Sequence, residues 1–232
     1  MVGRSDLDEV LAAARTGDFG GLDVLVAALR SPDQDVRLRA AYFCDRIGPA
    51  DAVPVLCTLA RDDSSPAVRN QALAALAATG LVGAVPALID VLGDDDPELR
   101  EDAEAALYVL IGDEVPALLR RAHDNDEPDA GQQDRLRAWW TERAPDFDPG
   151  TVYRAGLPAG PTALVDQLED LAAVPQDSVT AALLDWTGVE FPGSRVSVNR
   201  RWRAWLREYG DAYVPGRRYF AGHRVPVRAT PQ

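Results

Sequence analysis

The stretch VPVLCTLARDDSSPAVRNQALAALAATG occupies residues 53–80 and predicts a pair of helices. It begins with a Val-Pro pair, and proline is tolerated in the first turn of a helix, where its missing N–H has no intrahelical partner. An acidic and Ser-rich turn precedes Pro66, after which apolar side chains recur at helical spacing from Val68 to Leu76. Gly80 then stands where a helix end favours a left-handed residue. The stretch therefore predicts a helix, a turn and a second helix.

The same template occurs three times, in residues 25–47, 53–80 and 85–110. A helix pair that exposes one apolar face must stack on a neighbour to bury it, so the repeat predicts an α-solenoid. In each unit an apolar residue followed by Arg opens the second helix, at intervals of 32 and 31 residues: Val36-Arg37, Val68-Arg69 and Leu99-Arg100. We expect these three arginines to occupy equivalent places and to contact Asp side chains or backbone carbonyls in the adjoining turns.

The D-x-x-V-R-x-x-A pattern of these units resembles the HEAT-repeat family, in particular the short bacterial form also found in phycobilisome-lyase-like proteins. The resemblance covers about residues 20–120. It implies an all-α, right-handed α-solenoid. Most members of the family are scaffolds and a few are enzymes, so the resemblance is specific for fold and says little about activity.

A second duplication lies in the C-terminal half. RLRAWWTERAPDFDPGTVYRAG, from Arg135, and RWRAWLREYGDAYVPGRRYFAG, from Arg201, match at ten of 22 positions with a constant offset of 66. Upstream, ALYVLIG from Ala106 corresponds to ALLDWTG from Ala182. The match predicts one Trp-rich helical unit with a Pro-Gly turn, used twice. Between the copies, residues 162–173 and 178–186 are predicted to form two more helices.

We expect residues 1–122 to form the HEAT-repeat solenoid. Residues 123–232 would form the duplicated Trp-rich units, which continue or cap the solenoid after a break near 124–131. Such units are loosely similar to those that end a group of bacterial HEAT-repeat proteins, some of them encoded beside type VI secretion genes. That similarity carries no catalytic residues with it.

The charge is strongly asymmetric. The net charge is −13, but residues 191–232 carry +7, so the first 190 residues carry −20. An acidic body repels phosphate backbones and favours a basic protein partner, which makes nucleic acid an unfavourable ligand. All 24 basic residues are Arg, which is typical of a GC-rich bacterial genome. No apolar stretch is long enough to span a membrane and no signal peptide is visible, so we expect a cytoplasmic protein.

The histidines and cysteines do not form a metal motif. His123 and His223 are 100 residues apart, in different units, and we interpret both as surface residues. Cys44 and Cys57 lack any C-x-x-C spacing and are interpreted as small apolar side chains. The sequence therefore predicts neither a metal nor a cofactor.

Catalytic motifs are equally lacking in the sequence. It contains no G-x-S-x-G, no P-loop and no G-x-G-x-x-G. The acidic run that starts at Asp124 fails as a calcium loop at Pro128, Asp129 and Arg135, where such a loop needs an acidic residue or Asn, Gly and Glu. We expect no catalytic residues and a non-enzymatic role.

An aromatic and basic cluster near the C-terminus leaves three interpretations open. It can cap the solenoid, form a protein-binding patch, or bind single-stranded nucleic acid by stacking. Capping is favoured, because the first copy carries Trp139 and Tyr153 in a neutral-to-acidic setting. The cluster consists of Trp202, Trp205, Tyr209, Tyr213, Tyr219 and Phe220, interleaved with Arg200, Arg201, Arg203, Arg207, Arg217 and Arg218.

We predict a protein-interaction scaffold that binds a basic protein partner on its concave face, which second helices line in HEAT-type stacks. Three other functions stay open: an immunity or secretion-accessory protein that neutralises a toxin effector, a bilin lyase or isomerase, and a HEAT-type nucleic-acid-binding protein. Residues at the first, second and fifth positions after each repeat arginine are predicted to face outward. The predicted partner-binding residues are Leu38, Arg39, Tyr42, Asn70, Gln71, Glu101 and Asp102.

Overall fold

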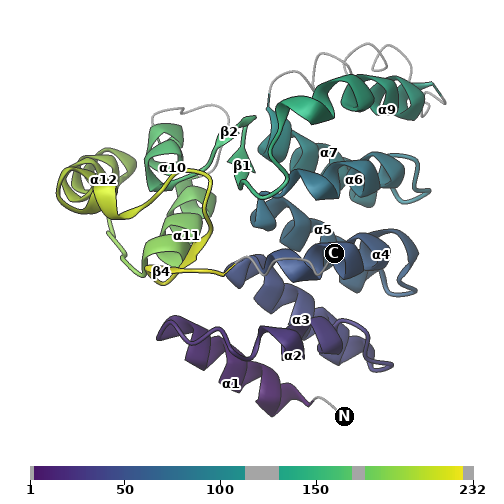
Figure 1. Cartoon of the computed structure of the whole chain (residues 1–232), viewed down its shortest axis with the longest axis horizontal. Helices are drawn as coiled ribbons and strands as arrows, with labels where there is room; N and C mark the ends of the chain where they lie inside the picture. Colours follow the sequence, from purple (N-terminus) through teal and green to yellow (C-terminus); the bar gives the residue numbers. More distant parts are fainter. Residues whose placement is uncertain (1–2, 113–130, 169–175, 227–232) are drawn as a thin grey trace.

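The computed structural model describes residues 3–112, 131–168 and 176–226, and it is mostly helical (Figure 1). None of the helices in these ranges combines the length and the apolar character needed to cross a membrane. The repeat region consists of α1 (Arg4–Arg15), α2 (Leu22–Ala28), α3 (Gln34–Ile47), α4 (Val53–Asp62), α5 (Pro66–Thr79), α6 (Val85–Val91) and α7 (Pro97–Ile111).

The repeat helices stack in two layers, which confirms the predicted α-solenoid. The first helices α2, α4 and α6 form one layer, and the second helices α3, α5 and α7 form the other (Figure 1). Short 3-10 helices, η1 (Ala50–Ala52) and η2 (Val82–Ala84), join successive pairs. Helix α1 packs on α2 and α3 and extends the stack beyond the template found in the sequence.

The helix ends follow from local sequence. Asp33 caps α3 by accepting a hydrogen bond from the Asp35 amide over 2.9 Å, and Asp96 caps α7 in the same way. Gly48 and Gly80 end α3 and α5 with φ values of 70° and 69°, in the left-handed region where glycine carries no Cβ penalty. The turn chemistry of the repeats therefore determines where each helix begins and ends.

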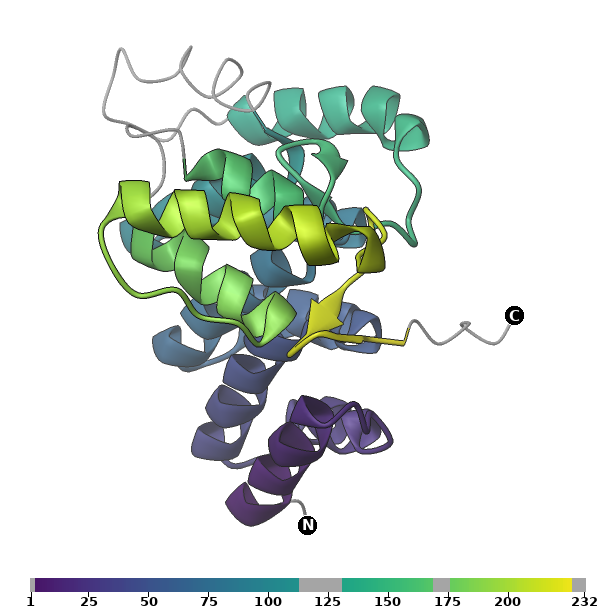
Figure 2. The ribbon, with the colours of Figure 1, turned by 90° about the vertical axis from the view of Figure 1, so that its left-hand side faces the viewer.

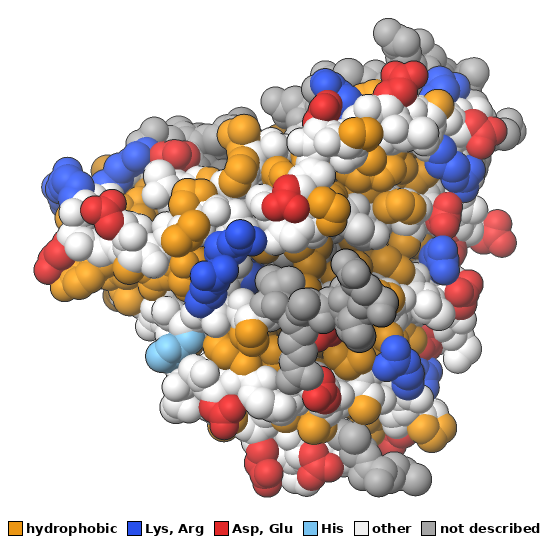
Figure 3. Space-filling model, in the orientation of Figure 1, with side chains coloured by type: hydrophobic (Ala, Val, Ile, Leu, Met, Phe, Trp, Pro, Cys, Tyr) orange, Lys and Arg blue, Asp and Glu red, His pale blue; other side chains and the backbone are white. Residues whose placement is uncertain are grey.

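The predicted arginine contacts are confirmed. Arg37, Arg69 and Arg100 each donate from Nη1 to the backbone carbonyl six residues earlier, over 2.9, 3.0 and 2.7 Å. Arg37 also binds the next repeat through a bidentate ion pair, in which its Nε and Nη2 donate to the two carboxylate oxygens of Asp63 over 2.7 and 2.9 Å. Acidic and basic side chains consequently lie side by side along the turn edge of the stack, on the right in Figure 3.

The Arg37–Asp63 pair predicts a pH-dependent stability. The Arg37 guanidinium, together with the Ser65 amide, lowers the pKa of the Asp63 carboxyl against the opposing effect of burial. A carboxyl whose pKa is lowered on folding stabilises the folded state above its unfolded pKa of about 3.9, and this stabilisation is lost as the pH falls below that value. We therefore expect Asp63→Asn to cost about 2 kcal/mol at pH 7, with a smaller cost at pH 3.

Urea unfolding of wild type, Asp63→Asn and Asp62→Asn at pH 7, 5 and 3 measures this difference. Asp62 is the matched control, since it is adjacent but exposed, and its substitution is expected to change stability by less than about 0.5 kcal/mol. A cost of Asp63→Asn that stays constant down to pH 3 would contradict the expectation.

The C-terminal module, residues 131–168 and 176–226, contains both Trp-rich copies. Two-residue strands form an antiparallel hairpin in each copy, β1 with β2 and β3 with β4. The elements are α9 (Gln132–Arg143), η4 (Ala144–Asp146), β1 (Tyr153–Arg154), β2 (Leu157–Pro158), α10 (Pro161–Gln167), α11 (Gln176–Thr187), α12 (Arg195–Tyr209), η5 (Gly210–Ala212), β3 (Tyr219–Phe220) and β4 (His223–Arg224). The predicted break at 124–131 lies outside the described residues except for Gly131, as does the end of the helix predicted over 162–173.

The two copies have the same local structure at the offset of 66. The helix, the 3-10 turn and the hairpin recur at equivalent positions. In each hairpin turn an alanine has positive φ, 50° at Ala155 and 48° at Ala221. Their amides donate to the carbonyls of Val109 and Asp185, each over 2.7 Å. Each hairpin is therefore held on the last turn of the helix that precedes its copy.

The C-terminal module lies along the side of the repeat stack. Helix α9 extends the layer of first helices, because it packs on α6 and Gln133 Nε2 donates to the carbonyls of Ile89 and Asp90. Helices α10, α11 and α12 instead lie beside the carboxyl ends of the second helices (Figures 1 and 2). The Tyr153 amide donates to the Gly80 carbonyl over 2.7 Å at this junction. The chain thus doubles back onto its own repeats.

Candidate binding surface

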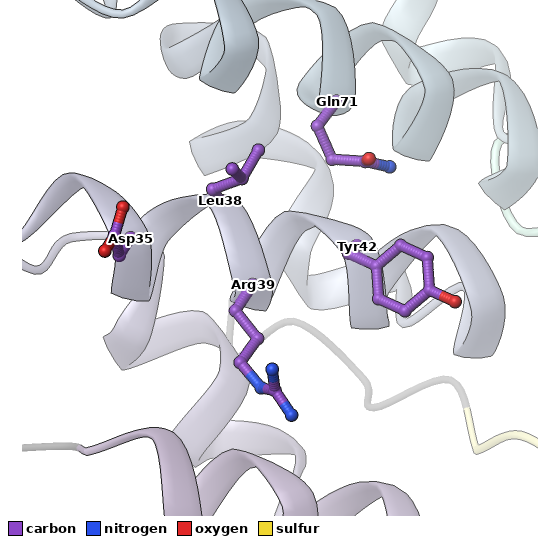
Figure 4. A pocket seen from close by; sticks show the side chains of 5 residues that line it. All are labelled: Asp35, Leu38, Arg39, Tyr42 and Gln71. Carbon is purple, nitrogen blue, oxygen red and sulfur yellow. The ribbon is translucent and has the colours of Figure 1, made fainter.

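We call the part of α3, α5 and α7 that bears the predicted binding residues, from Leu38 to Asp102, the second-helix face. A pocket of about 420 Å³ opens on it. Figure 4 shows Arg39 directed toward the helix below α3, and Gln71 on the helix above it. The pocket is lined by Asp35, Leu38, Arg39, Tyr42 and Gln71.

Leu38 and Tyr42 provide the apolar part of this pocket. They are four residues apart on α3 and therefore share one side of the helix. Leu38 is half-buried, whereas the Tyr42 side chain is 44% exposed, with its ring centroid 5.7 Å from that of Phe43. A large exposed aromatic beside a half-buried leucine is suited to anchor a partner side chain.

The positive charge inside the pocket is compensated within the protein. Arg39 forms an ion pair with Asp8 of α1, and its guanidinium carbon lies 5.2 Å from the centre of the Phe43 ring. The pocket thus holds the carboxylate of Asp35 beside an arginine whose charge is balanced by Asp8.

The acidic pair on α7 adds carboxylates to the second-helix face. Glu101 and Asp102 are both exposed. The pKa of Asp102 is raised by partial burial and by the neighbouring negative charges of Glu101 and Asp96. Like charges held together destabilise the ionised form, and an incoming cation would relieve that repulsion.

The predicted partner-binding residues thus fall into two groups. Leu38, Arg39, Tyr42 and Gln71 line one pocket, while Glu101 and Asp102 lie two helices away along the second-helix face. Asn70 is half-buried, and its side-chain oxygen has no hydrogen-bond partner within the described residues. Their role in binding stays a prediction. Asp35 was missed, because the outward positions were counted forward from each repeat arginine.

A second hollow, of about 490 Å³, separates the carboxyl half of α5 from α11. Alanines form much of its wall, among them Ala74 and Ala77 from α5 and Ala181 from α11. None of the seven predicted binding residues lines this hollow, so the C-terminal module packs beside a part of the second helices for which the sequence made no prediction.

Charged side chains fasten the module at this hollow. Arg218 is 7% exposed, and burial lowers its pKa to about 10, which leaves it charged at neutral pH. Its Nε donates to the Ile47 carbonyl over 3.1 Å and its Nη2 to the Arg46 carbonyl over 2.6 Å. Arg46 in turn donates from Nε to Asp185 over 3.0 Å. These contacts satisfy the last carbonyls of α3, which no longer have intrahelical donors.

The aromatic residues near the C-terminus form the internal core of the module. Trp202 is 1% exposed, and its ring lies 4.9 Å from Phe191 and 5.4 Å from Trp205. Tyr219 and Phe220 are also buried. Bases cannot stack on rings that are covered by protein, so Trp202, Tyr219 and Phe220 are not available as a stacking platform for nucleic acid.

The histidines and cysteines show no metal-binding geometry where the structure describes them. His223 is exposed on β4, and His123 and the acidic run from Asp124 lie outside the described residues. Cys44 and Cys57 are free thiols, and burial raises the pKa of each. Within the described ranges, no three His, Cys, Asp or Glu side chains are grouped as metal ligands.

Comparison with known proteins adds the following findings. Residues 22–108 match the family model for HEAT repeats. No curated protein is significantly similar in sequence to this chain. Two crystal structures from the Northeast Structural Genomics Consortium, both described as engineered proteins, are similar to it. One is 24% identical over 77% of this chain and 86% of its own, with a TM-score of 0.38. The other is 22% identical over 85% of this chain and 56% of its own, with a TM-score of 0.40.

Proposed function

Because residues 22–108 belong to the HEAT-repeat family, we propose that this chain is a non-catalytic scaffold that binds a basic segment of a protein partner. The observation that carries the proposal is the open pocket on α3 and α5, in which an exposed Tyr42 and a half-buried Leu38 lie beside the Asp35 carboxylate. Stacked helix pairs present such extended surfaces to partners.

Two features of the second-helix face support a basic, partly apolar partner. Leu38 and Tyr42 offer the apolar contact that dominates the energy of most interfaces. Asp35 lines the same pocket, Glu101 and Asp102 are exposed on α7, and Arg39 is paired with Asp8. Complementary charge accelerates the encounter between partners, whereas buried apolar anchors determine how long the complex lasts.

The test is a charge reversal on α7. We expect Glu101→Arg with Asp102→Arg to slow association with the partner about tenfold at low salt, because the local field that attracts a basic segment is removed. The partner is captured from a lysate of the source organism, purified, and used for binding kinetics at two ionic strengths.

The matched control is Asp51→Arg with Asp62→Arg, which makes the same change in net charge at exposed positions in η1 and α4, the first-helix layer. A local role of the second-helix face requires the α7 pair to slow association more than the control pair does. If both pairs slow association equally, the effect comes from net charge alone and the second-helix face has no local role. Retention of nucleic acid as the main captured species would refute the proposal.

A further inference from the structure

A pocket of about 420 Å³ opens on the first Trp-rich copy, between α9, the first hairpin and the last residue of α7. Its wall includes the aromatic rings of Trp139, Phe147 and Tyr153, and the charged side chains of Arg143 and Asp146 stand in it as well. Arg143 and Asp146 form an ion pair of 3.4 Å and are both largely exposed. The pocket is therefore aromatic inside and charged at its mouth.

The second copy shows how the same place looks when it is filled. At the offset of 66, Trp205 corresponds to Trp139 and Tyr209 corresponds to Arg143. The Tyr209 ring covers Trp205 with a centroid distance of 5.5 Å and an interplanar angle of 35°. Such an offset arrangement is favourable for two aromatic rings. In the second copy, the residue one helical turn after the tryptophan thus supplies one of the rings that pack on it, beside Trp202 at 5.4 Å and Tyr213 at 5.6 Å.

In the first copy, Arg143 takes the position that corresponds to Tyr209. Within the described residues, the ring neighbour of Trp139 is Trp140, at a centroid distance of 6.2 Å. Phe147, which corresponds to Tyr213, packs on Trp140 instead, at 5.4 Å. The first copy therefore has no aromatic ring at the position equivalent to Tyr209 that could pack on Trp139.

The polar rim also matches a tyrosine. In the second copy the Glu208 carboxylate raises the pKa of the Tyr209 phenol. In the first copy Asp146 lines the pocket and offers a carboxylate acceptor, and Arg143 offers N–H donors. A phenol ring that entered beside Trp139 would thus meet an aromatic wall and a polar group for its hydroxyl.

We infer that the pocket beside Trp139 binds a tyrosine side chain presented by a protein partner, in the place that Tyr209 fills in the second copy. Because the charged rim of the pocket is exposed, a phenol ring inserted beside Trp139 would stay open to solvent on that side. Small-molecule sites, in contrast, enclose most of their ligand. A side chain that is already held by a partner fits such a half-open pocket. This site lies on a different part of the molecule from the proposed second-helix face and goes beyond that proposal.

The experiment is a titration of the ¹⁵N-labelled full chain with N-acetyl-tyrosine amide, followed through the indole N–H resonance of Trp139. We expect a saturable shift with a dissociation constant on the order of 1 mM, which is usual for a ligand of this size. N-acetyl-leucine amide should produce less than about one fifth of that shift. The variant Arg143→Tyr should lose most of the shift, because its own tyrosine occupies the pocket as Tyr209 does.

The reciprocal variant is Tyr209→Arg, which uncovers Trp205. It should gain a saturable shift of the Trp205 indole resonance that wild type does not show. The inference fails if the Trp139 resonance does not move in wild type, or if Arg143→Tyr binds the probe as wild type does. Tighter binding of free p-cresol than of N-acetyl-tyrosine amide would indicate a small-molecule site and would equally overturn it.

Discussion

Replacing Arg218 with alanine is expected to destabilise the protein by about 3 kcal/mol at pH 7. The guanidinium donates to the carbonyls of Ile47 and Arg46 at the end of α3, and its carbon lies 5.1 Å from the centre of the Trp186 ring. Removing it leaves buried carbonyls without donors. It also removes a positive charge near Asp45, which matters because burial already raises the pKa of Asp45. Asp185 keeps its ion pair with Arg46.

Urea unfolding monitored by circular dichroism measures this effect, and Arg207→Ala on the exposed side of α12 is the matched control. Arg207 is expected to change stability by less than about 0.5 kcal/mol. A second variant, Arg218→Met, keeps most of the packing volume and removes the charge. If Arg218→Met is as stable as wild type, packing alone holds the module and the hydrogen bonds to α3 are dispensable.

Replacing Gly80 with alanine is expected to cost about 3 kcal/mol, from two sources. The φ of 69° is in the left-handed region, where a Cβ atom costs about 1–2 kcal/mol. That Cβ would also lie 2.4 Å from Cγ1 of Val152 and 2.9 Å from the carbonyl oxygen of Tyr153. The backbone cannot retreat freely, because the Gly80 carbonyl accepts the Tyr153 amide over 2.7 Å.

Thermal and urea unfolding test this prediction, with Gly83→Ala as the control. A Cβ at Gly83 would lie 4.0 Å from Cγ1 of Val53, an ordinary van der Waals distance, so little change is expected there. Hydrogen exchange at the Tyr153 amide should accelerate in Gly80→Ala if the module separates from α5. Wild-type stability of Gly80→Ala would show that the module does not pack on this helix end as closely as the structure has it.

The sequence by itself determined the repeat stack, because its causes are local. Arg37, Arg69 and Arg100 each donate to the backbone carbonyl six residues earlier, and the cap and glycine at a helix end act on their own helix. The duplicated unit was visible for the same reason, since its hairpin and turn geometry repeat with the same residues. Four of the seven predicted binding residues line one pocket, because helical spacing alone decides which side of a helix they share.

Only the tertiary structure decided where the C-terminal module lies. Arg218 reaches carbonyls 171 and 172 residues away, and nothing in its local sequence distinguishes it from the adjacent Arg217, which donates to Gly150 instead. The last carbonyls of the helix in every repeat lack intrahelical donors in the same way. Which of these carbonyls accepts a hydrogen bond from which arginine therefore depends on how the module packs against the repeats. That docking places the module beside the carboxyl half of α5 and leaves Tyr42 and Glu101 exposed, because burial is a property of the assembled fold and not of periodicity.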